Sequence, residues 1–280
     1  MSTSRIVDLH THTTASDGLV SPEALVARAR EKGLAAVAVT DHDTVAALRA
    51  ASEAGRAQGV EVLWGVEISC VHSGREVHVL GYLLERPTVV DEAVRRLQTG
   101  REERMRAMIE RANDLGLSVT YAEVAALAGG ESLGRPHLAR ALARLGYVRS
   151  EEEAFGRYLA DDRPLNVPKT RLSIDEAVKT VRRAGGLPVL AHPGLHKLDD
   201  MLDELVDAGI AGLEAYYPMH TSAQTERYLA YARKRNLAVT GGSDFHGDGL
   251  PDRELGGVRV PYACVEALRD RRAGKDASWP

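Results

Sequence analysis

The sequence predicts an α/β protein in which a largely parallel, barrel-like sheet is interrupted by a small helical insertion. Three observations lead to this fold class. Short β-branched runs alternate with helix-like segments in both the first and the last part of the chain. This alternation stops between about residues 96 and 168. Histidine, aspartate and glutamate stand at or near the ends of most of the β-branched runs.

The first barrel stretch, residues 1–95, holds four of these runs. "RIVDLH" precedes the helix-like "SPEALVARAREKG", and "AAVAVTDHD" precedes "TVAALRAASEAG". The runs "VEVLWGVEIS" and "EVHVLGYL" follow. Ser21 is a suitable N-cap and Pro22 a suitable first-turn residue, so we expect a helix to begin there.

The insertion, residues 96–168, is predicted to be helical. Its apolar residues recur at helical spacing in three groups, which are Met105, Met108, Ile109, Ala112 and Leu115; Leu138, Leu142 and Leu145; and Phe155, Tyr158 and Leu159. We expect this segment to form a small domain that covers the active site.

The second barrel stretch, residues 169–280, returns to the alternating pattern. Ser173 and Glu176 form a capping box ahead of an amphipathic helix. The runs "LPVLAHPG", "IAGLEAYY", "LAVTGGSDFHG" and "GGVRV" then supply the remaining strands.

Composition excludes several classes of function. The net charge of −4 and the aromatic content of 5% argue against a reader of duplex DNA or RNA. Cys70 and Cys264 are too few for a disulfide framework or a cysteine metal site. We found neither a targeting segment nor an apolar run that could span a membrane, so we expect a soluble, cytoplasmic protein.

Metal-binding side chains gather at the predicted strand ends. His10 and His12 are two residues apart, so both can point to the same side of a strand. The other candidates at or near strand ends are Asp41, His42, Asp43, Glu67, His78, His192, Asp244 and His246. Barrels place their active sites at the carboxyl ends of the strands. Because imidazole and carboxylate ligands suit Zn, Mn or Fe, the pattern predicts a site for more than one divalent ion.

The motifs "DLHTHTTASDG", "VTDHD", "GVEIS", "AHPG" and "GGSDFHG" resemble, in order and spacing, those of the PHP (polymerase and histidinol phosphatase) superfamily of metal-dependent phosphoesterases. The resemblance spans residues 6 to about 260. It implies the PHP fold, a distorted seven-stranded (β/α) barrel with a metal cluster at the carboxyl ends of its strands.

The same resemblance implies which residues hold two to three divalent ions. The first ion takes His10, His12 and Asp244, with Glu67 bridging; the second takes His78 and His192; the third position is surrounded by Asp17, His42 and His246. Many family members with three tightly bound ions have histidine in place of Asp17, so we expect a weaker third site. Manganese is the first expectation, and zinc or iron also fits the ligands.

Within the superfamily, "TTASDG", "LGRPHLARAL" and "GGSDFHG" resemble a group of nucleoside 3',5'-bisphosphate phosphatases and 5'-to-3' exoribonucleases of short RNA. Arg135 and His137 match the insertion motif of this group and suit a phosphate. Alternatively, "GRPH" merely begins a helix. Weaker candidates for substrate contact are Lys169, His196 and His220. Asp8 is expected to orient a ligand histidine, and His72 to be solvated.

The function expected from these residues is hydrolysis of nucleotide phosphate esters by a metal-bound hydroxide. The residues expected to act in catalysis are Asp17, His42, Arg135, His137 and His246. The substrate would be a small nucleotide, such as adenosine 3',5'-bisphosphate, or the 5'-phosphorylated end of a short RNA. Neither duplex DNA nor a membrane is an expected partner.

Three other readings remain open. Histidinol phosphatase belongs to the same superfamily, although Asp17 and the insertion carrying Arg135 argue against it. Amide hydrolysis uses similar barrels and ligands. A non-catalytic metal-binding module is a third reading, but here every motif position holds a residue able to bind metal.

Overall fold

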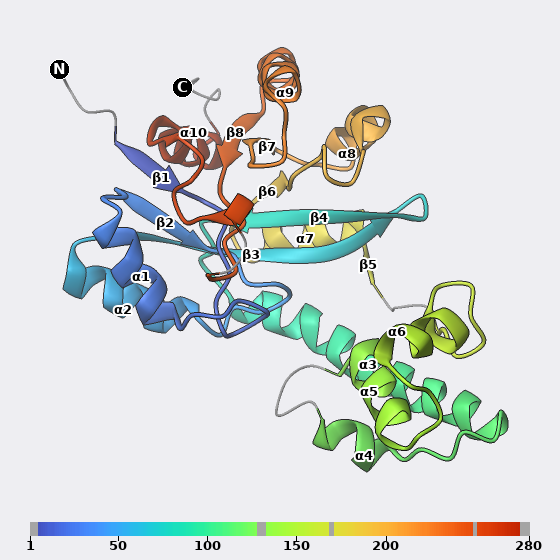
Figure 1. Cartoon of the computed structure of the whole chain (residues 1–280). Helices are drawn as coiled ribbons and strands as arrows, with labels where there is room; N and C mark the ends of the chain where they lie inside the picture. Colours follow the sequence, from blue (N-terminus) through green and yellow to red (C-terminus); the bar gives the residue numbers. More distant parts are fainter. Residues whose placement is uncertain (1–4, 128–132, 168–170, 249–250, 275–280) are drawn as a thin grey trace. The chain divides into compact units, whose positions relative to one another are not determined.

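The computed structural model describes residues 5–127, 133–167, 171–248 and 251–274. The chain forms two compact units (Figure 1). The barrel unit comprises Met1–Ala93 and Leu172–Pro280, and the helical unit comprises Val94–Arg171.

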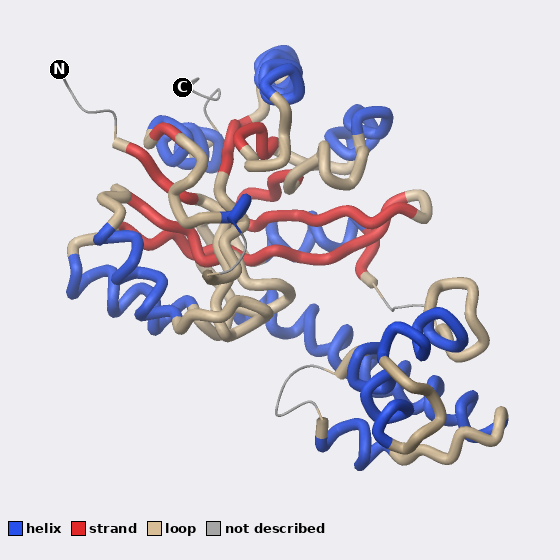
Figure 2. The backbone as a smooth tube through the Cα atoms, in the orientation of Figure 1, coloured by secondary structure: helices blue, strands red, loops and turns tan. Residues whose placement is uncertain are grey.

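The barrel unit is built on one sheet (Figure 2). Its strands are β1 (Ile6–Asp8), β2 (Ala36–Val39), β3 (Glu61–His72), β4 (Arg75–Tyr82), β5 (Leu172–Ser173), β6 (Leu187–Leu190), β7 (Gly212–Tyr216), β8 (Ala238–Gly241) and β9 (Val260–Pro261). They lie in the order β8-β7-β6-β4-β3-β2-β1-β9, and β5 pairs with β3. Strands β2, β6 and β8 are buried along their length, as strands covered on both faces must be.

The sheet is less parallel than the sequence predicts. β1, β2 and β3 are mutually parallel, and so are β6, β7 and β8. β4, however, is antiparallel to both β3 and β6. The reason is the short turn between β3 and β4, in which Ser73 has a φ angle of 47° and Gly74 a φ angle of 78°. A turn of two such residues makes a hairpin, whereas a parallel neighbour would need a long crossover.

The segment that follows β1 meets the end of β8 beside the first histidine pair. The amide of Leu9 donates to Gly241 O at 3.1 Å, and that of His12 donates to Phe245 O at 2.8 Å. A Cβ at Gly242 would stand 2.3 Å from the nitrogen of His10, so only glycine fits there. We call this junction the β1–β8 closure. It places the start and the end of the barrel sequence side by side.

The helices of the barrel unit pack on the outside of the sheet (Figure 1). They are α1 (Pro22–Glu31), α2 (Leu48–Gln58), α7 (Ile174–Arg183), α8 (Leu202–Asp207), α9 (Ser222–Lys234) and α10 (Ala263–Arg272), with 3-10 turns η2 (Asp199–Met201) and η3 (Pro251–Arg253). Ser21 caps α1, and Ser173 with Glu176 forms a capping box on α7. Both predicted helix starts are therefore confirmed.

The helical unit has its own apolar core. It contains most of α3 (Thr88–Asp114), then α4 (Tyr121–Ala126), α5 (Arg135–Arg144), α6 (Glu151–Ala154) and the π-helical turn η1 (Phe155–Leu159). Met105, Met108, Leu138, Leu142 and Leu159 are nearly inaccessible to solvent within it. Two of the expected apolar positions are instead exposed, because Leu115 lies past the end of α3 and Leu145 is the C-cap of α5.

Among the described residues, no helix is both long enough and apolar enough to cross a membrane.

Candidate metal centre

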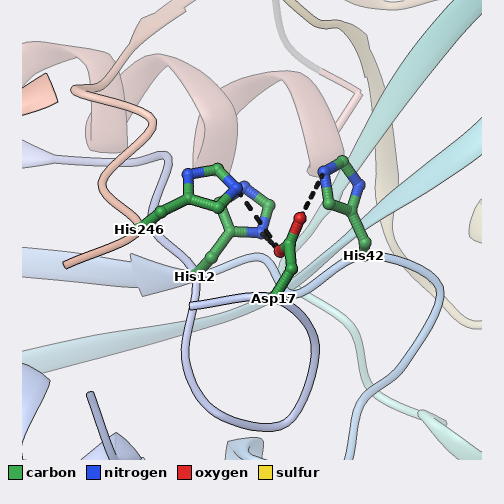
Figure 3. Close-up of side chains that lie close together, drawn as sticks. All are labelled: His12, Asp17, His42 and His246. Atoms are coloured by element: carbon green, nitrogen blue, oxygen red, sulfur yellow. Dashed lines mark ion pairs between the residues drawn. The ribbon is translucent and has the colours of Figure 1, made fainter. Parts of the chain in front are cut away.

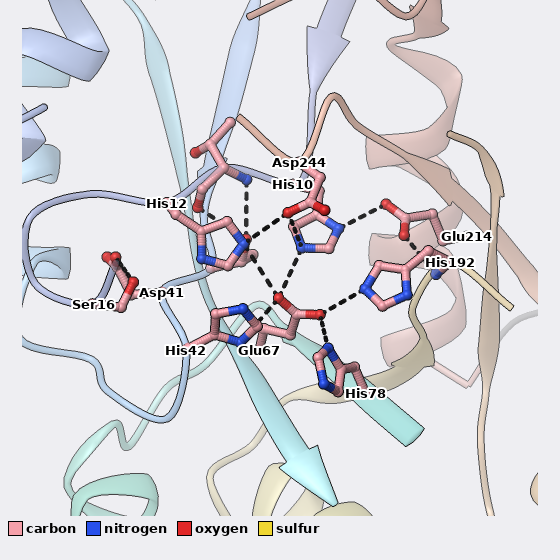
Figure 4. Close-up of polar contacts among 12 residues, drawn as sticks. His10, His12, Ser16, Asp41, His42, Glu67, His78, His192, Glu214 and Asp244 are labelled. Carbon is pink, nitrogen blue, oxygen red and sulfur yellow. Dashed lines mark hydrogen bonds and ion pairs between the residues drawn. The ribbon is translucent and has the colours of Figure 1, made fainter. Parts of the chain in front are cut away.

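Glu67 of β3 lies at the centre of a cluster of histidines and carboxylates (Figure 4). Its side chain is fully buried, and five histidine rings approach it within hydrogen-bonding range. Oε2 faces His10 at 3.0 Å, His12 at 3.2 Å and His42 at 3.3 Å. Oε1 faces His78 at 2.8 Å and His192 at 2.9 Å. The two carboxylate oxygens therefore serve two different groups of imidazoles.

The five histidines come from four different chain segments. His10 and His12 follow β1, and their ring centroids lie 5.2 Å apart, as expected for alternate residues of an extended segment. His42 follows β2, where it forms an isolated bridge with Glu67. His78 lies on β4, and His192 follows β6 with a positive φ of 23°.

Asp244, which follows β8, adds a second buried carboxylate. Its Oδ1 lies 3.2 Å from Nε2 of His12 and 3.5 Å from Nε2 of His10. One ligand atom from each of His10, His12, Glu67 and Asp244 fits within 4.8 Å of the others. Two imidazoles and two carboxylates therefore face one point.

Asp17 forms a more open group with three histidines (Figure 3). Its Oδ1 lies 3.3 Å from His246 and 3.7 Å from His12, and its Oδ2 lies 3.9 Å from His42. The Asp17 side chain is 57% exposed, in contrast to the fully buried Glu67. This group is therefore the solvent-facing part of the centre.

The loop that carries Asp17 is held by Asp41, which the sequence placed only among the candidates at strand ends. The carboxylate of Asp41 accepts from the amide of Thr13 at 2.7 Å, from its hydroxyl at 2.8 Å and from the Ser16 hydroxyl at 2.6 Å. Asp41 thus organises the turn rather than facing the histidines.

The electrostatics of the cluster favour cations. Burial lowers the pKa of His12, but Asp244 and Glu67 outweigh burial and raise it to about 9. Burial also lowers the pKa of His78, but the charge of Glu67 outweighs burial and raises this pKa to about 10. Burial would raise the pKa of Glu67 and of Asp244, but the surrounding histidines hold both well below the usual range. The carboxylates therefore stay ionised and need positive charge close by.

Histidines with less carboxylate contact behave in the opposite way. Burial lowers the pKa of His42 to about 4, despite Glu67 and Asp17 nearby. Burial and then the neighbouring His192 lower the pKa of His196 to about 4. Such imidazoles are neutral at physiological pH, which is the form that binds metal.

These donors fit a multinuclear divalent-metal site. Buried carboxylates are costly unless a cation balances them. Nδ1 of His12 and Nδ1 of His192 are buried without a hydrogen-bond partner among the described residues. Ions coordinated by these nitrogens and carboxylates would meet both requirements.

Glu214 on β7 is an outer residue that the sequence analysis missed. Its Oε1 lies 3.0 Å from Nδ1 of His10, and its Oε2 accepts the backbone amide of His192 at 2.7 Å. A carboxylate on the outer nitrogen of a ligand histidine fixes the orientation of the ring. A glutamate inside the apolar run "IAGLEAYY" was the signal that could have found it.

Asp8, the residue expected to orient a ligand ring, acts differently. Its carboxylate accepts from the backbone amide of His10 at 3.3 Å, from the amide and hydroxyl of Ser243, and from the amide of Gly256. Asp8 therefore holds the backbone of the β1–β8 closure, while Glu214 holds the His10 ring.

Asp244 is held from behind by two further residues. The Tyr217 hydroxyl donates to Oδ2 at 2.9 Å, and Arg253 reaches the same oxygen at 2.7 Å. Oδ1 is left facing the histidines. No pattern in the sequence distinguishes Arg253 from other surface arginines, so only the fold reveals this contact.

The predicted phosphate-binding pair belongs to the helical unit. Arg135 lies at the start of α5 and contacts Asp161 at 2.6 Å and the carbonyl of Leu159 at 3.0 Å. The Nδ1 atom of buried His137 accepts the amide of Gly134 at 3.1 Å. His137 therefore caps the helix, which supports the alternative reading of "GRPH" for that nitrogen.

The remaining candidates lie in or near loops. His196 stands beside His78 and His192, with ring centroids 4.9 and 5.0 Å away. His220 accepts the amide of Gly194 and contacts Ala215 O with its other nitrogen, so it supports a turn. His72, expected to be solvated, is 3.0 Å from Glu204. Lys169 lies outside the described residues.

The fold and the site define a class, the metal-dependent barrel hydrolases with a cluster of histidines and carboxylates at the strand ends. A family model described as PHP domain matches residues 8–160, which is more than half of the chain. The chain belongs to the PHP domain family, as its motifs predict.

Curated relatives cover nearly the whole chain. It is 33% identical to the 5'-3' exoribonuclease Rnm of Salmonella typhimurium, over 94% of this chain and 92% of the relative. It is 31% identical to the 3',5'-nucleoside bisphosphate phosphatase of Chromobacterium violaceum, over 95% and 96%. It is 35% identical to the phosphoribosyl 1,2-cyclic phosphate 1,2-diphosphodiesterase of Eggerthella lenta, over 86% and 94%.

A solved structure agrees in fold. A candidate metal-dependent phosphoesterase from Bifidobacterium adolescentis superposes with a TM-score of 0.75 at 32% identity, over 96% of each chain. This similarity confirms the predicted α/β barrel of the PHP type. Together, the relatives confirm a phosphoesterase of the PHP family, related to bisphosphate phosphatases and exoribonucleases.

Proposed function

We propose that this chain releases phosphate from nucleoside 3',5'-bisphosphates, or nucleotides from 5'-phosphorylated short RNA, using two to three divalent ions. The observation that carries the proposal is that the two carboxylate oxygens of Glu67 face different histidines. Oε2 faces His10, His12 and His42. Oε1 faces His78 and His192. A carboxylate placed in this way can bridge two ions, which is the arrangement used for in-line displacement at phosphorus.

The residues that would hold the ions fall into three sets. The first set is His10, His12, Asp244 and Glu67; the second is Glu67, His78 and His192; the third is Asp17, His42 and His246. Divalent ions, manganese first and zinc or iron as alternatives, would lower the pKa of a bound water and neutralise charge on the phosphate. Because Asp17 is more exposed than the other carboxylates, its set is the weakest.

The chain's own residues would then position the phosphate. In the helical unit, Arg135 offers a planar guanidinium fork. Burial and then Arg135 and Arg171 lower the pKa of Arg104, and the single carboxylate of Asp161, which pairs with Arg135 at 2.6 Å, opposes them only in part. An excess of positive charge at this point favours an anionic ligand. Either an ion of the third set or His246, which contacts both Asp17 and Asp244 Oδ1, would assist the leaving oxygen.

The nucleotide assignment draws support from the relatives with near-complete coverage, a bisphosphate phosphatase and an exoribonuclease. A second candidate is a cyclic phosphodiesterase of sugar phosphates, because the relative from Eggerthella lenta has 35% identity. Both candidates use the same metal centre, so only the substrate distinguishes them.

The test is a panel of substrates assayed with manganese and followed by chromatography. The panel contains adenosine 3',5'-bisphosphate, a 5'-phosphorylated RNA trinucleotide, ribose 1,2-cyclic phosphate 5-phosphate and histidinol phosphate. We expect turnover of the first two, and at least a tenfold loss of kcat/KM in Arg135→Ala. Turnover confined to the cyclic phosphate or to histidinol phosphate would refute the nucleotide assignment.

A further inference from the structure

A third histidine accompanies the two that define the second ion set. His196 lies on the turn that follows β6, four residues after His192. The three ring centroids of His78, His192 and His196 are 4.9 to 5.2 Å apart, and no pair is stacked face to face. One nitrogen from each ring fits within 4.8 Å of the other two.

The trio has nitrogens that the protein leaves unsatisfied. Nε2 of His196 and Nδ1 of His192 are buried and have no hydrogen-bond partner among the residues that the structure describes. A buried polar atom without a partner is costly, so such atoms in a native fold usually bind an ion or an ordered water. Metal coordination satisfies an imidazole nitrogen that has no donor or acceptor beside it.

The turn that carries His196 is firmly held. The amide of Gly194 donates to Nε2 of His220 at 3.2 Å, and the amide of Leu198 donates to Pro193 O at 3.0 Å. A Cβ at Gly194 would stand 2.8 Å from the His220 ring. Leu198 is fully buried, which anchors the end of the turn. His196 is therefore presented to His78 and His192 by a preorganised backbone.

We infer that His196 is a direct ligand of the second ion, together with His78 and His192. This inference rests on the proposed metal centre but not on its proposed substrate. It replaces the expectation of a substrate contact for His196 with a role in metal binding.

The inference gives the two main ion sets different chemistry. The first set has two imidazoles and two carboxylates, whereas the second would have three imidazoles, two of which lie 2.8 and 2.9 Å from Oε1 of Glu67. Imidazole-rich sites suit zinc, iron and cobalt, while oxygen-rich sites suit manganese. The second position should therefore prefer the later transition metals more strongly than the first.

The test measures metal binding directly. Full-length wild type, His196→Gln and His72→Gln are stripped with a chelator and titrated with Co(II), with bound metal counted by elemental analysis and followed by visible absorption. We expect His196→Gln to bind one ion at least tenfold more weakly and to lose part of the cobalt absorption. His72→Gln is the matched control, because His72 lies on the β3–β4 hairpin away from the trio, and it should behave as wild type.

A crystal structure of the zinc-loaded wild type provides a test without mutation. The inference requires a His196 nitrogen within coordination distance, about 2.0–2.1 Å, of an ion. Unchanged cobalt affinity and spectrum in His196→Gln, or a His196 ring beyond this distance, would overturn it. If His196→Gln loses tight metal binding and the wild type hydrolyses no nucleotide, the inference stands and the proposed function is rejected.

Discussion

At the scale of single residues, each carboxylate of the centre has a separate task that its hydrogen bonds assign. Both carboxylate oxygens of Glu67 face histidines. Asp244 directs one oxygen to the histidines, and Tyr217 and Arg253 hold the other. Glu214 lies behind the His10 ring and contacts its outer nitrogen. The positions of ligand atoms therefore depend on residues that touch no ion. Such outer contacts change affinity by about 10- to 100-fold in metal sites.

Glu214→Gln should weaken binding of the ion held by His10 by about tenfold, because the neutral amide polarises the His10 ring less. Isothermal titration with Mn measures this. Glu204→Gln is the matched control, since Glu204 also contacts a histidine, His72 at 3.0 Å, but at an exposed site. Equal affinities for wild type and Glu214→Gln would show that Glu214 does not tune the His10 ring.

At the scale of elements, the sequence predicted the strand-end pattern but not how the strands pair. The spacing of His10 and His12 and the run before Glu67 are local signals, and local periodicity reports which way side chains point. The antiparallel placement of β4 depends on the turn at Ser73 and Gly74. The contact between Arg253 and Asp244 depends on the whole fold, so no local pattern encodes it.

The same limit applies to the helical unit. Helical periodicity predicted its elements and most of its core. The pairing of Arg135 with Asp161 joins residues on different segments, so the motif around Arg135 could not show it. Apolar spacing does not mark where these helices end, because Leu115 and Leu145 keep the spacing after the helix has stopped.

Gly242→Ala should disrupt the β1–β8 closure. The added methyl would stand 2.3 Å from the nitrogen and 2.5 Å from the Cβ of His10, so the backbone must shift. Overpacking of this kind costs about 1–3 kcal/mol and here would also displace a ligand. Urea unfolding and metal content measure the two effects.

Gly156→Ala is the control for this change, because a Cβ at Gly156 meets nothing within 4 Å. It should leave both stability and metal content at wild-type values. Gly242→Ala with wild-type stability and metal content would mean that the closure tolerates a side chain.

At the scale of the whole molecule, the two units have separate cores, and the proposed metal ligands lie in one unit alone. All ten residues proposed as metal ligands, His196 included, belong to the barrel unit, whereas Arg135 and His137 belong to the helical unit. Damage to the core of the helical unit should therefore leave metal binding by the barrel unit intact.

Leu142→Ala tests this independence. Leu142 is fully buried in the core of the helical unit, and its truncation should cost about 2–5 kcal/mol there. Hydrogen exchange should show faster opening of α3 and α5, while bound metal stays at the wild-type level. Leu115→Ala, at a position 53% exposed, is the control. Loss of metal in Leu142→Ala would indicate that the two units depend on each other.

Metal removal should make stability depend strongly on pH. The folded pKa values of His12 and His78, about 9 and about 10, exceed the unfolded value of about 6.5, so their contribution is complete below pH 6.5 and lost as pH rises toward 10. The folded pKa of His42 is lowered to about 4, so its contribution is lost as pH falls from about 6.5 to 4.

The chelator-treated protein should consequently have its highest melting temperature near pH 6.5 and a lower one at pH 9.5. In the metal-loaded protein the imidazoles are neutral ligands, so the fall above neutral pH should be smaller. Thermal melts followed by circular dichroism compare the two forms. Parallel pH profiles with and without metal would contradict the proposed ligand roles of His12 and His78.

The β1–β8 closure also fixes when this centre can come into being during synthesis. Asp8 and Ser243, which meet there, are 235 positions apart in the chain. At ribosomal speeds of about 5–20 residues per second, roughly 10–50 s separate the translation of His10 from that of Asp244. Throughout that interval the early histidines lack their last carboxylate partner. His10 can therefore bind an ion with full affinity only after the ribosome has translated Asp244.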